Sequence, residues 1–364
     1  MSTTLLHHVP EPIRKKLGHQ SPVCLLNGRD VFRFLAHESL IIMGCNARIP
    51  LVIPGIMRAA EELDAIVSFQ LTRTEGGLDG GCTGQTPDSF FTTVVRFAEE
   101  CRFSKPFILH ADHVTVQDTS LTEKKDVRRL LADQLAAGFT SFALDASFNP
   151  LPDNISLVTE LAQPLIAAGC GLEVELGEVK AVGAVSNLTT VAETEEFLEG
   201  LAAKGVSPHL LAIDNGSQSG NYLDGQVVKL DLERTGEIFA AARRFGLAGL
   251  VQHGITGTPL RIVGKLADYG IRKGNIGTLW QNVAHAGLPV ELLDAMRAWA
   301  RESGRDIKHA TRVFKSQIDV IPAENARQIA DMDYQEAKEF LSAFQATGSA
   351  SRLARFLAEE PCGS

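Results

Sequence analysis

The 364-residue sequence predicts an α/β protein, a (β/α)8 (TIM) barrel with a C-terminal helical extension. First, short apolar segments alternate with helical segments about eight times over roughly 250 residues, the rhythm of this fold. Second, polar side chains follow the ends of those segments, on the face where such barrels build active sites. An open doubly wound sheet shares the alternation. Its usual glycine-rich dinucleotide fingerprint is missing after the first strand, where the chain reads Asn46-Ala47-Arg48-Ile49-Pro50.

The chain divides into three expected regions: an N-terminal helical preface over 1–35, the barrel over 36–285, and a helical extension over 286–364. In its first half, apolar runs bounded by turn residues indicate strands. Asp88 is the expected N-cap of the second barrel helix, and Gly138 closes the third. We expect strands at 40–45, 65–71, 107–113 and 141–144, and helices at 52–63, 89–101, 127–137 and 154–168.

The second half of the chain continues the alternation of strands and helices. Gly169 and Gly205 end helices, and Pro259 opens one at a position where proline is tolerated. We expect strands at 171–176, 210–213, 249–252 and near 271–278, and helices at 195–204, 230–245 and 259–269. The tail reads as helices at 290–302, 307–314, 323–329, 334–344 and 353–359.

Composition and charge exclude several functional classes. The net charge is −9 and there is no basic stripe, which argues against a nucleic-acid partner. No apolar run approaches the ~20 residues that span a bilayer, and the N-terminus lacks the features of a secretory signal. The six cysteines form no C-x-x-C pair, which favours reduced thiols. A cytoplasmic protein without a membrane partner is the expectation.

The segment 107–113 ends in the polar cluster His110, Asp112 and His113. His113 and His253 follow different strands, and a closed barrel brings such strand ends around one mouth. Two histidines and a third ligand, with one position open, make a catalytic zinc site. Three carboxylates could complete the ligand set or orient the histidines: Asp145, Glu173 and Glu175. The alternative for these acids is a buried structural role with a Lys or Arg partner.

Two glycine- and threonine-containing loops follow the seventh and eighth strands, at 254–258 and 274–278. Small residues let backbone N–H groups approach an anion, and phosphate sites of these barrels frequently use this pair of loops. Each loop alone is also an ordinary tight turn. Together they predict a phosphate site. The candidates for substrate and phosphate contacts are Asn46, Gly254, Thr256, Gly257, Asn275 and Thr278.

Several motifs together resemble the class II, metal-dependent fructose-bisphosphate and tagatose-bisphosphate aldolases. The run 108–113 resembles the family's LHxDH signature, and 250–254 resembles its LVLHGxS strand. Asn275 matches the Asn of its NIDT loop. Three further segments resemble AGFTSVMIDAS, LEIELG and FGSA, namely 137–147, 171–177 and 347–350. The resemblance runs in order over roughly residues 25–350.

The resemblance implies that His113 and His253 are zinc ligands, with Zn²⁺ as the cofactor or another divalent metal in its place. It implies that Asp112 is the acid/base at a substrate hydroxyl and that Glu175 is an acid near the metal. Asp145 and Glu173 would touch a second metal position. The loops after strands seven and eight would hold the phosphate of a ketose.

Three departures accompany the resemblance. The family's third zinc histidine is replaced by Ser219, so Glu175 or Asp214 becomes the candidate third ligand. Gly277 replaces the aspartate of the NIDT loop, and Phe148 replaces a histidine. Because these changes remove polar contacts around a substrate, they argue against ordinary glycolytic fructose-bisphosphate cleavage.

The leading hypothesis is an aldehyde-lyase that makes or cleaves a C–C bond next to the ketone of a phosphorylated sugar. An isomerase or epimerase acting through the same ene-diolate is the second. A catalytically silent paralogue, acting as a subunit or ligand sensor, is the third. The expected partner is a small phosphorylated sugar, and the helical tail suggests a homodimer or homotetramer.

Overall fold

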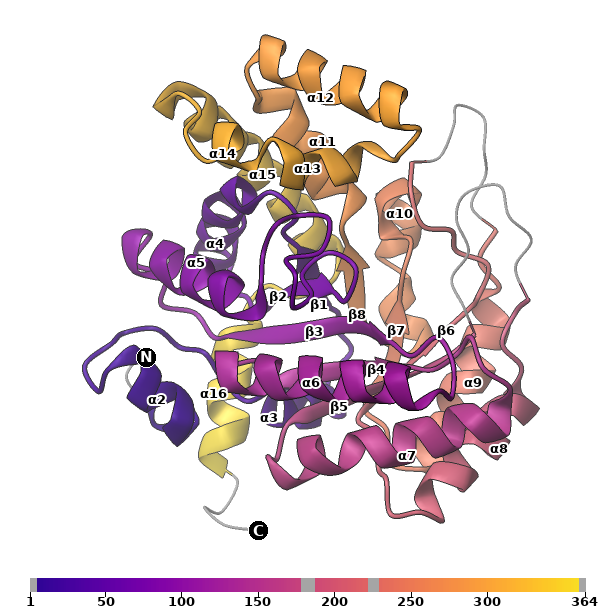
Figure 1. Cartoon of the computed structure of the whole chain (residues 1–364). Coiled ribbons are helices and arrows are strands. Elements are labelled where there is room, and N and C mark those ends of the chain that lie inside the picture. The colour runs from indigo at the N-terminus through magenta and orange to yellow at the C-terminus, as the bar shows by residue number, and fades with distance from the viewer. Residues whose placement is uncertain (1–4, 178–186, 222–228, 360–364) are drawn as a thin grey trace.

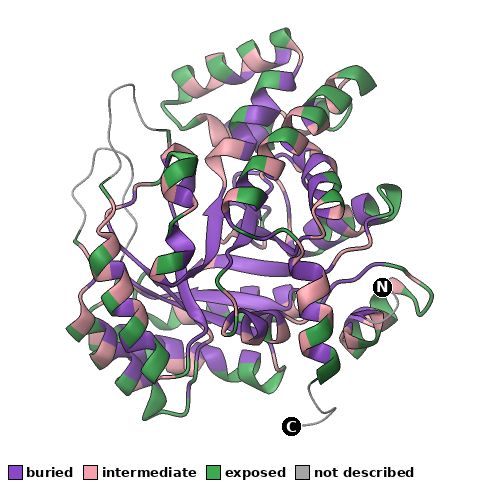
Figure 2. Cartoon of the chain, turned by 180° about the vertical axis from the view of Figure 1, so that it is seen from behind, coloured by how far each residue is buried: buried purple, intermediate pink, exposed green. Residues whose placement is uncertain are grey.

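The computed structural model describes residues 5–177, 187–221 and 229–359. Eight parallel strands close into one barrel in sequence order, and β8 pairs with β1 (Figure 1). The (β/α)8 prediction is confirmed. The strands are β1 Ile42–Asn46, β2 Val67–Thr72, β3 Phe107–Thr115, β4 Ser141–Asp145, β5 Gly171–Leu176, β6 Leu210–Ile213, β7 Gly249–Gln252 and β8 Ile271–Ile276. Nearly all of their residues are buried, as the purple interior of Figure 2 shows.

Helices surround the barrel and extend beyond it. The preface contains η1 Leu6–His8, α2 Glu11–Leu17 and α3 Gly28–Leu35. Between strands lie η2 Pro50–Val52, α4 Ile53–Glu62, α5 Pro87–Glu100, α6 Leu121–Ala137, α7 Leu151–Ala167, α8 Val191–Ala202, α9 Leu232–Arg244, η3 Ile255–Gly257, α10 Leu260–Val263 and η4 Leu266–Tyr269. After β8 come α11 Thr278–Gly287, α12 Val290–Ser303, η5 Ile307–His309, α13 Ala310–Val313, α14 Lys315–Ile318, α15 Ala323–Ala343 and α16 Ser349–Glu359.

The starts of the first two strands were predicted two residues too early, and their ends one residue too early. The apolar residues before β1 and β2 are buried, but their N–H groups bond to segments outside the barrel ladder. Ile41 donates to the Phe344 carbonyl at 2.9 Å, and Ile66 donates to Oγ of Ser349 at 2.9 Å. Both acceptors belong to the C-terminal extension, which therefore anchors the start of the sheet.

Helix starts were the other source of error. The N-cap of α5 is Thr86, which forms a reciprocal capping box with Ser89, so Asp88 lies inside the helix. The helix α6 begins at Leu121, capped by Ser120, six residues before the expected start; its first turns are polar and carry no apolar periodicity. The helix α8 begins at Val191, behind a second capping box.

In the second half of the chain, the errors concern whether a helical segment forms one helix or two. The expected helix 259–269 divides into α10 and η4, and 307–314 divides into η5 and α13. The two tail helices 323–329 and 334–344 form one helix of 21 residues, α15. The helices α11 and α14 were not predicted. Because α11 spans residue 285, the expected end of the barrel region falls inside a helix.

The C-terminal extension packs directly on the barrel layer. The long helix α15 lies against α4 and α11, and α16 lies against α3 (Figure 1). Gly55 of α4 permits the close approach of α15, because a Cβ there would lie 2.3 Å from the Ala330 carbonyl oxygen. Within the described residues, no helix is long and apolar enough to cross a membrane.

Candidate active site

The end of β3 brings two consecutive side chains, Asp112 and His113, to the mouth of the barrel. Consecutive residues of a regular strand point to opposite faces. Here the register with β4 shifts between Ala111 and Val114, and His113 has a φ of 42°, in the left-handed region. Such an irregularity re-aims side chains, and non-glycine residues in this region often mark functional sites. The sequence signature thus folds into a local backbone distortion with both groups in one pocket.

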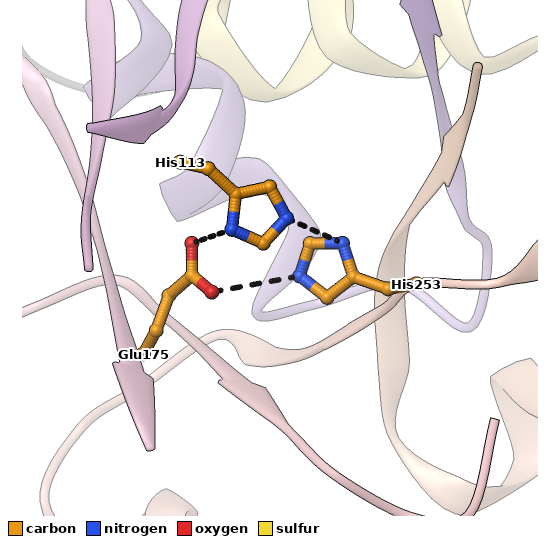
Figure 3. Close-up of side chains that lie close together, drawn as sticks. All are labelled: His113, Glu175 and His253. Carbon is orange, nitrogen blue, oxygen red and sulfur yellow. Dashed lines mark hydrogen bonds and ion pairs between the residues drawn. The ribbon is translucent and has the colours of Figure 1, made fainter. Parts of the chain in front are cut away.

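His113, Glu175 and His253 come from β3, β5 and the end of β7 and converge at this mouth (Figure 3). Nδ1 of His113 lies 2.9 Å from Oε1 of Glu175, and Nε2 of His113 lies 3.2 Å from Nδ1 of His253. Nε2 of His253 lies 3.9 Å from Oε2 of Glu175. One ligand atom from each residue falls within 4.8 Å of the others. Asp145 stands behind them, its Oδ2 3.3 Å from Nδ1 of His113.

This set fits a divalent metal. Neutral imidazole and carboxylate groups are the ligands that zinc takes in catalytic sites. His253 is buried, and its Nε2 makes no hydrogen bond with any residue that the structure describes. A buried nitrogen without a partner is costly unless a ligand satisfies it. The donor atoms of these three residues therefore fit a divalent ion, and Asp145 contacts His113 from a neighbouring strand.

The pKa values of these side chains follow from their burial and from the crowding of acids around them. Burial raises the pKa of Glu175 to about 8, and the negative charge of Asp145 adds to the rise. Burial lowers the pKa of His253 to about 3, assisted by the neighbouring His113. Burial also lowers the pKa of His113, but the Glu175 and Asp112 carboxylates outweigh it and hold this pKa well above its usual value. Of the three residues His113, Glu175 and His253, His113 is therefore the one that carries a positive charge.

Asp112 is held by two amides. Its Oδ1 accepts a hydrogen bond from Nδ2 of Asn275 at 2.8 Å, and its Oδ2 accepts one from Nδ2 of Asn46 at 3.0 Å. Burial would raise the pKa of Asp112, but nearby positive charges, those of His113 and Lys273, lower it below its ordinary value. Asp112 is therefore an ionised carboxylate in a fixed orientation.

A second buried cluster lies beneath this site. Nζ of Lys273 is 2.9 Å from Oε2 of Glu173 and 3.1 Å from Nε2 of His110, and all three side chains are fully buried. His110 also contacts Oγ of Ser141 at 2.9 Å. Ligand atoms of His110, Asp112 and Glu173 converge as metal ligands would, but the Lys273 ammonium already supplies their cation. This cluster fits a structural ion pair and does not fit a second metal.

The phosphate candidates lie beside the metal candidates. A pocket of about 130 Å³ is lined by Asp112, His113 and His253, and by five of the six predicted substrate contacts, Asn46, Gly254, Thr256, Asn275 and Thr278. Gly257 is not among its lining residues. The segment after β7 is tied to the start of α11, since Leu279 N–H donates to Oγ1 of Thr256 at 3.1 Å.

The family follows from comparison with known proteins. Residues 27–333 match the model of the class-II fructose-bisphosphate aldolase family, which is most of the chain. The chain belongs to this family.

Two relatives within the class II aldolase family share about 30% of their aligned residues with this chain. The fructose-bisphosphate aldolase of Staphylococcus epidermidis is 31% identical over 196 residues, 52% of this chain and 62% of that relative. The probable fructose-bisphosphate aldolase of Bacillus subtilis is 28% identical over 230 residues, 62% of this chain and 71% of that relative. The chain therefore matches less than two thirds of the length of the Staphylococcus protein.

Solved structures support the same fold. The YdjI aldolase of Escherichia coli K12 has a TM-score of 0.63 at 20% identity, covering 88% of this chain and 98% of its own. A putative fructose-1,6-biphosphate aldolase of Coccidioides immitis has a TM-score of 0.64 at 21% identity, covering 88% of this chain and 96% of its own.

Some positions of this class II aldolase family member depart from the predicted site. Asp214 is buried, but its Oδ1 accepts from the Gly216 N–H, and it is not among the three converging ligand residues. Ser219 lines the pocket, whereas Phe148 does not line it and is 45% exposed. The sequence interpretation overlooked several site residues, namely Arg48, Thr72, Glu75 and Lys273. Strand alternation could have revealed Lys273, which shares a face of β8 with Asn275.

Proposed function

We propose that this protein is a metal-dependent lyase that makes or cleaves a C–C bond next to the ketone of a ketose phosphate. The observation that carries the proposal is the convergence of His113, Glu175 and His253 beside Asp112 and the two loops at one barrel mouth. Family membership supports the same reaction class. The metal would be Zn²⁺ or another divalent ion, held by the two histidines and Glu175.

A divalent ion held by His113, Glu175 and His253 would supply Lewis acidity to the ketone of the substrate. The chain supplies the proton chemistry. In the cleavage direction the Asp112 carboxylate accepts the proton of the hydroxyl on the carbon being released as an aldehyde. The electron pair of the broken C–C bond then enters the ketone fragment and forms an ene-diolate. Asn46 and Asn275 keep the carboxylate aimed during this transfer.

The loops after β7 and β8 supply the phosphate contacts in this proposal. Gly254 has a φ of 66°, and a Cβ there would lie 2.5 Å from the Gln218 carbonyl oxygen, so a glycine is required at this turn. Thr256 bonds to the start of α11 through the Leu279 N–H. Gly277 and Ser219 line the pocket and stand at positions that are polar or metal-binding in the resemblance. For this reason the proposed substrate is a ketose phosphate other than fructose 1,6-bisphosphate.

The reaction is tested by proton exchange. The zinc-loaded protein is incubated with dihydroxyacetone phosphate in D₂O, and deuterium uptake at the hydroxymethyl carbon is followed by NMR. We expect exchange that stops on chelation and returns when zinc is added. A panel of aldehydes then identifies the condensation partner. Absence of exchange in protein shown to contain zinc would contradict the aldolase and leave the silent paralogue.

A further inference from the structure

Arg48 follows β1 and reaches the same pocket as the proposed catalytic groups, although the mechanism above gives it no role. Its side chain is 14% exposed. Among the described residues that line the pocket, it is the only lysine or arginine, whereas Glu75 and Asp112 both contribute carboxylates. A phosphate dianion entering this pocket therefore meets two acids and needs a fixed positive charge on the protein side.

Two neighbours fix the guanidinium of Arg48. Its Nε donates to Oε1 of Glu75 at 2.5 Å, and its Nη1 donates to Oε1 of Gln281 at 2.8 Å. Glu75 is itself held, because its Oε2 accepts from the Thr72 N–H at 3.1 Å. Nη2 makes no hydrogen bond with any described residue. The group is thus rigid on two sides and keeps one donor nitrogen available, and guanidinium N–H groups match the geometry of phosphate oxygens.

Gly277 makes room for this nitrogen. A Cβ on Gly277 would lie 3.1 Å from Nη2 of Arg48 and 3.3 Å from Cβ of Asn46. Gly277 immediately precedes α11, whose first residue, Thr278, lines the pocket. Any larger side chain would stand between the guanidinium and this helix start. An acidic side chain, which the resemblance places here, would also pair with the guanidinium and repel an anion.

We propose that Arg48 binds the phosphate group of the substrate, with Gly277 leaving the space and with Glu75 and Gln281 as positioning residues. The inference rests on the proposed function in one respect, since it takes the ligand to be a phosphorylated ketose. It adds a charged donor from β1 to the loops after β7 and β8, and it makes the phosphate the group by which this chain selects its substrate.

The test is equilibrium binding, measured by calorimetry on the zinc-loaded protein. The ligands are dihydroxyacetone phosphate, inorganic phosphate and unphosphorylated dihydroxyacetone. In Arg48→Gln we expect both phosphate ligands to bind about 10- to 100-fold more weakly, as for loss of a charge-assisted hydrogen bond. Dihydroxyacetone should bind as to wild type. Arg58→Gln removes an exposed arginine of α4 that is paired with Asp331, and it should match wild type.

Two further variants guard against a folding artefact. Arg48→Gln with Glu75→Gln keeps the net charge and leaves no unpaired carboxylate, and it should lose phosphate affinity to the same extent. Gly277→Asp should weaken phosphate binding with Arg48 intact. Binding of dihydroxyacetone phosphate to Arg48→Gln within twofold of wild type would overturn the inference, as would a wild type that binds no phosphate ligand.

The two proposals fail separately. If phosphate binding depends on Arg48 but the wild type catalyses no proton exchange, the phosphate site stands and the lyase does not. If the wild type catalyses exchange and Arg48→Gln binds phosphate normally, the lyase stands and Arg48 is a structural partner of Glu75.

Discussion

Nζ of Lys273 lies 2.9 Å from Oε2 of Glu173, and neither side chain is exposed to solvent. This pair lies inside the barrel beneath the candidate metal site, and Asp112 Oδ1 is 3.8 Å from the same ammonium. The Lys273 ammonium thus lies close to two carboxylates, those of Glu173 and Asp112. It holds Asp112 ionised from below while the two asparagine amides hold it from above.

Replacing Lys273 by Met should destabilise the protein by about 3–5 kcal/mol, because Glu173 would remain buried without its partner. Urea unfolding of the metal-free protein measures the change. Adding Glu173→Gln to Lys273→Met should restore much of the loss. Lys315→Met, which removes an exposed i,i+4 partner of Asp319, should cost no more than about 1 kcal/mol. Equal stability of wild type and Lys273→Met would rule out this role.

The sequence predicts the fold and the strand ends well where burial alone determines them. The strands β5, β6 and β7 have the expected bounds, because each is a short run whose outer and inner faces are both covered. The starts of β1 and β2 could not be predicted. These starts depend on hydrogen bonds to Phe344 and Ser349, which lie hundreds of residues later in the chain.

The candidate site, like the strands, was predicted only in part. Sequence motifs identified His113, Glu175 and His253, which the structure places together. The orientation of His113 depends on a backbone irregularity that no local sequence pattern predicts. Arg48 and Glu75 were overlooked because a charged residue in a loop usually faces solvent, and only the folded chain shows that these two line a pocket.

His113→Gly and His113→Ala should both abolish stoichiometric zinc binding, since each removes a ligand. They should differ in stability. At a φ of 42° a Cβ is unfavourable, so the glycine variant should be more stable than the alanine variant by about 1 kcal/mol. Zinc is measured by elemental analysis and stability by urea unfolding. His37→Ala, an exposed histidine outside the pocket, is the control. Zinc retained in both His113 variants would exclude the proposed ligand set.

Asp112→Asn should separate proton transfer from metal binding. The amide cannot accept the proton of the hydroxyl on the carbon released as an aldehyde, so condensation of dihydroxyacetone phosphate with an aldehyde, and the reverse cleavage, should slow by about 10²- to 10⁴-fold. Deuterium exchange at the hydroxymethyl carbon of dihydroxyacetone phosphate does not involve that hydroxyl and should persist. Zinc content should be unchanged, because Asp112 is not one of the three proposed metal ligands His113, Glu175 and His253. Asp126→Asn, on the exposed side of α6, should react like wild type. Condensation and cleavage rates within a few-fold of wild type in Asp112→Asn would assign the hydroxyl proton to another group.

Asp333 of α15 should make stability depend on pH. It is fully buried, and neither carboxylate oxygen has a hydrogen-bond partner among the described residues. Burial, assisted by Glu336, raises its pKa from 3.8 to about 9. The folded state therefore binds a proton that the unfolded state releases between these values. This contribution to stability is complete below pH 3.8 and is lost as the pH rises toward 9.

Asp333→Asn should remove this dependence, because the amide is neutral at every pH. The variant should match wild type near pH 4 and exceed it by about 1–3 kcal/mol near pH 8, a fraction of the ~1.4 kcal/mol per pH unit that full coupling allows. Urea unfolding at several pH values measures the difference, in which the titration of all other groups cancels. Asp331→Asn, on the exposed face of the same helix, should leave the pH profile unchanged. Parallel profiles for wild type and Asp333→Asn would mean that Asp333 is ionised in the folded protein and has a partner that stabilises its charge.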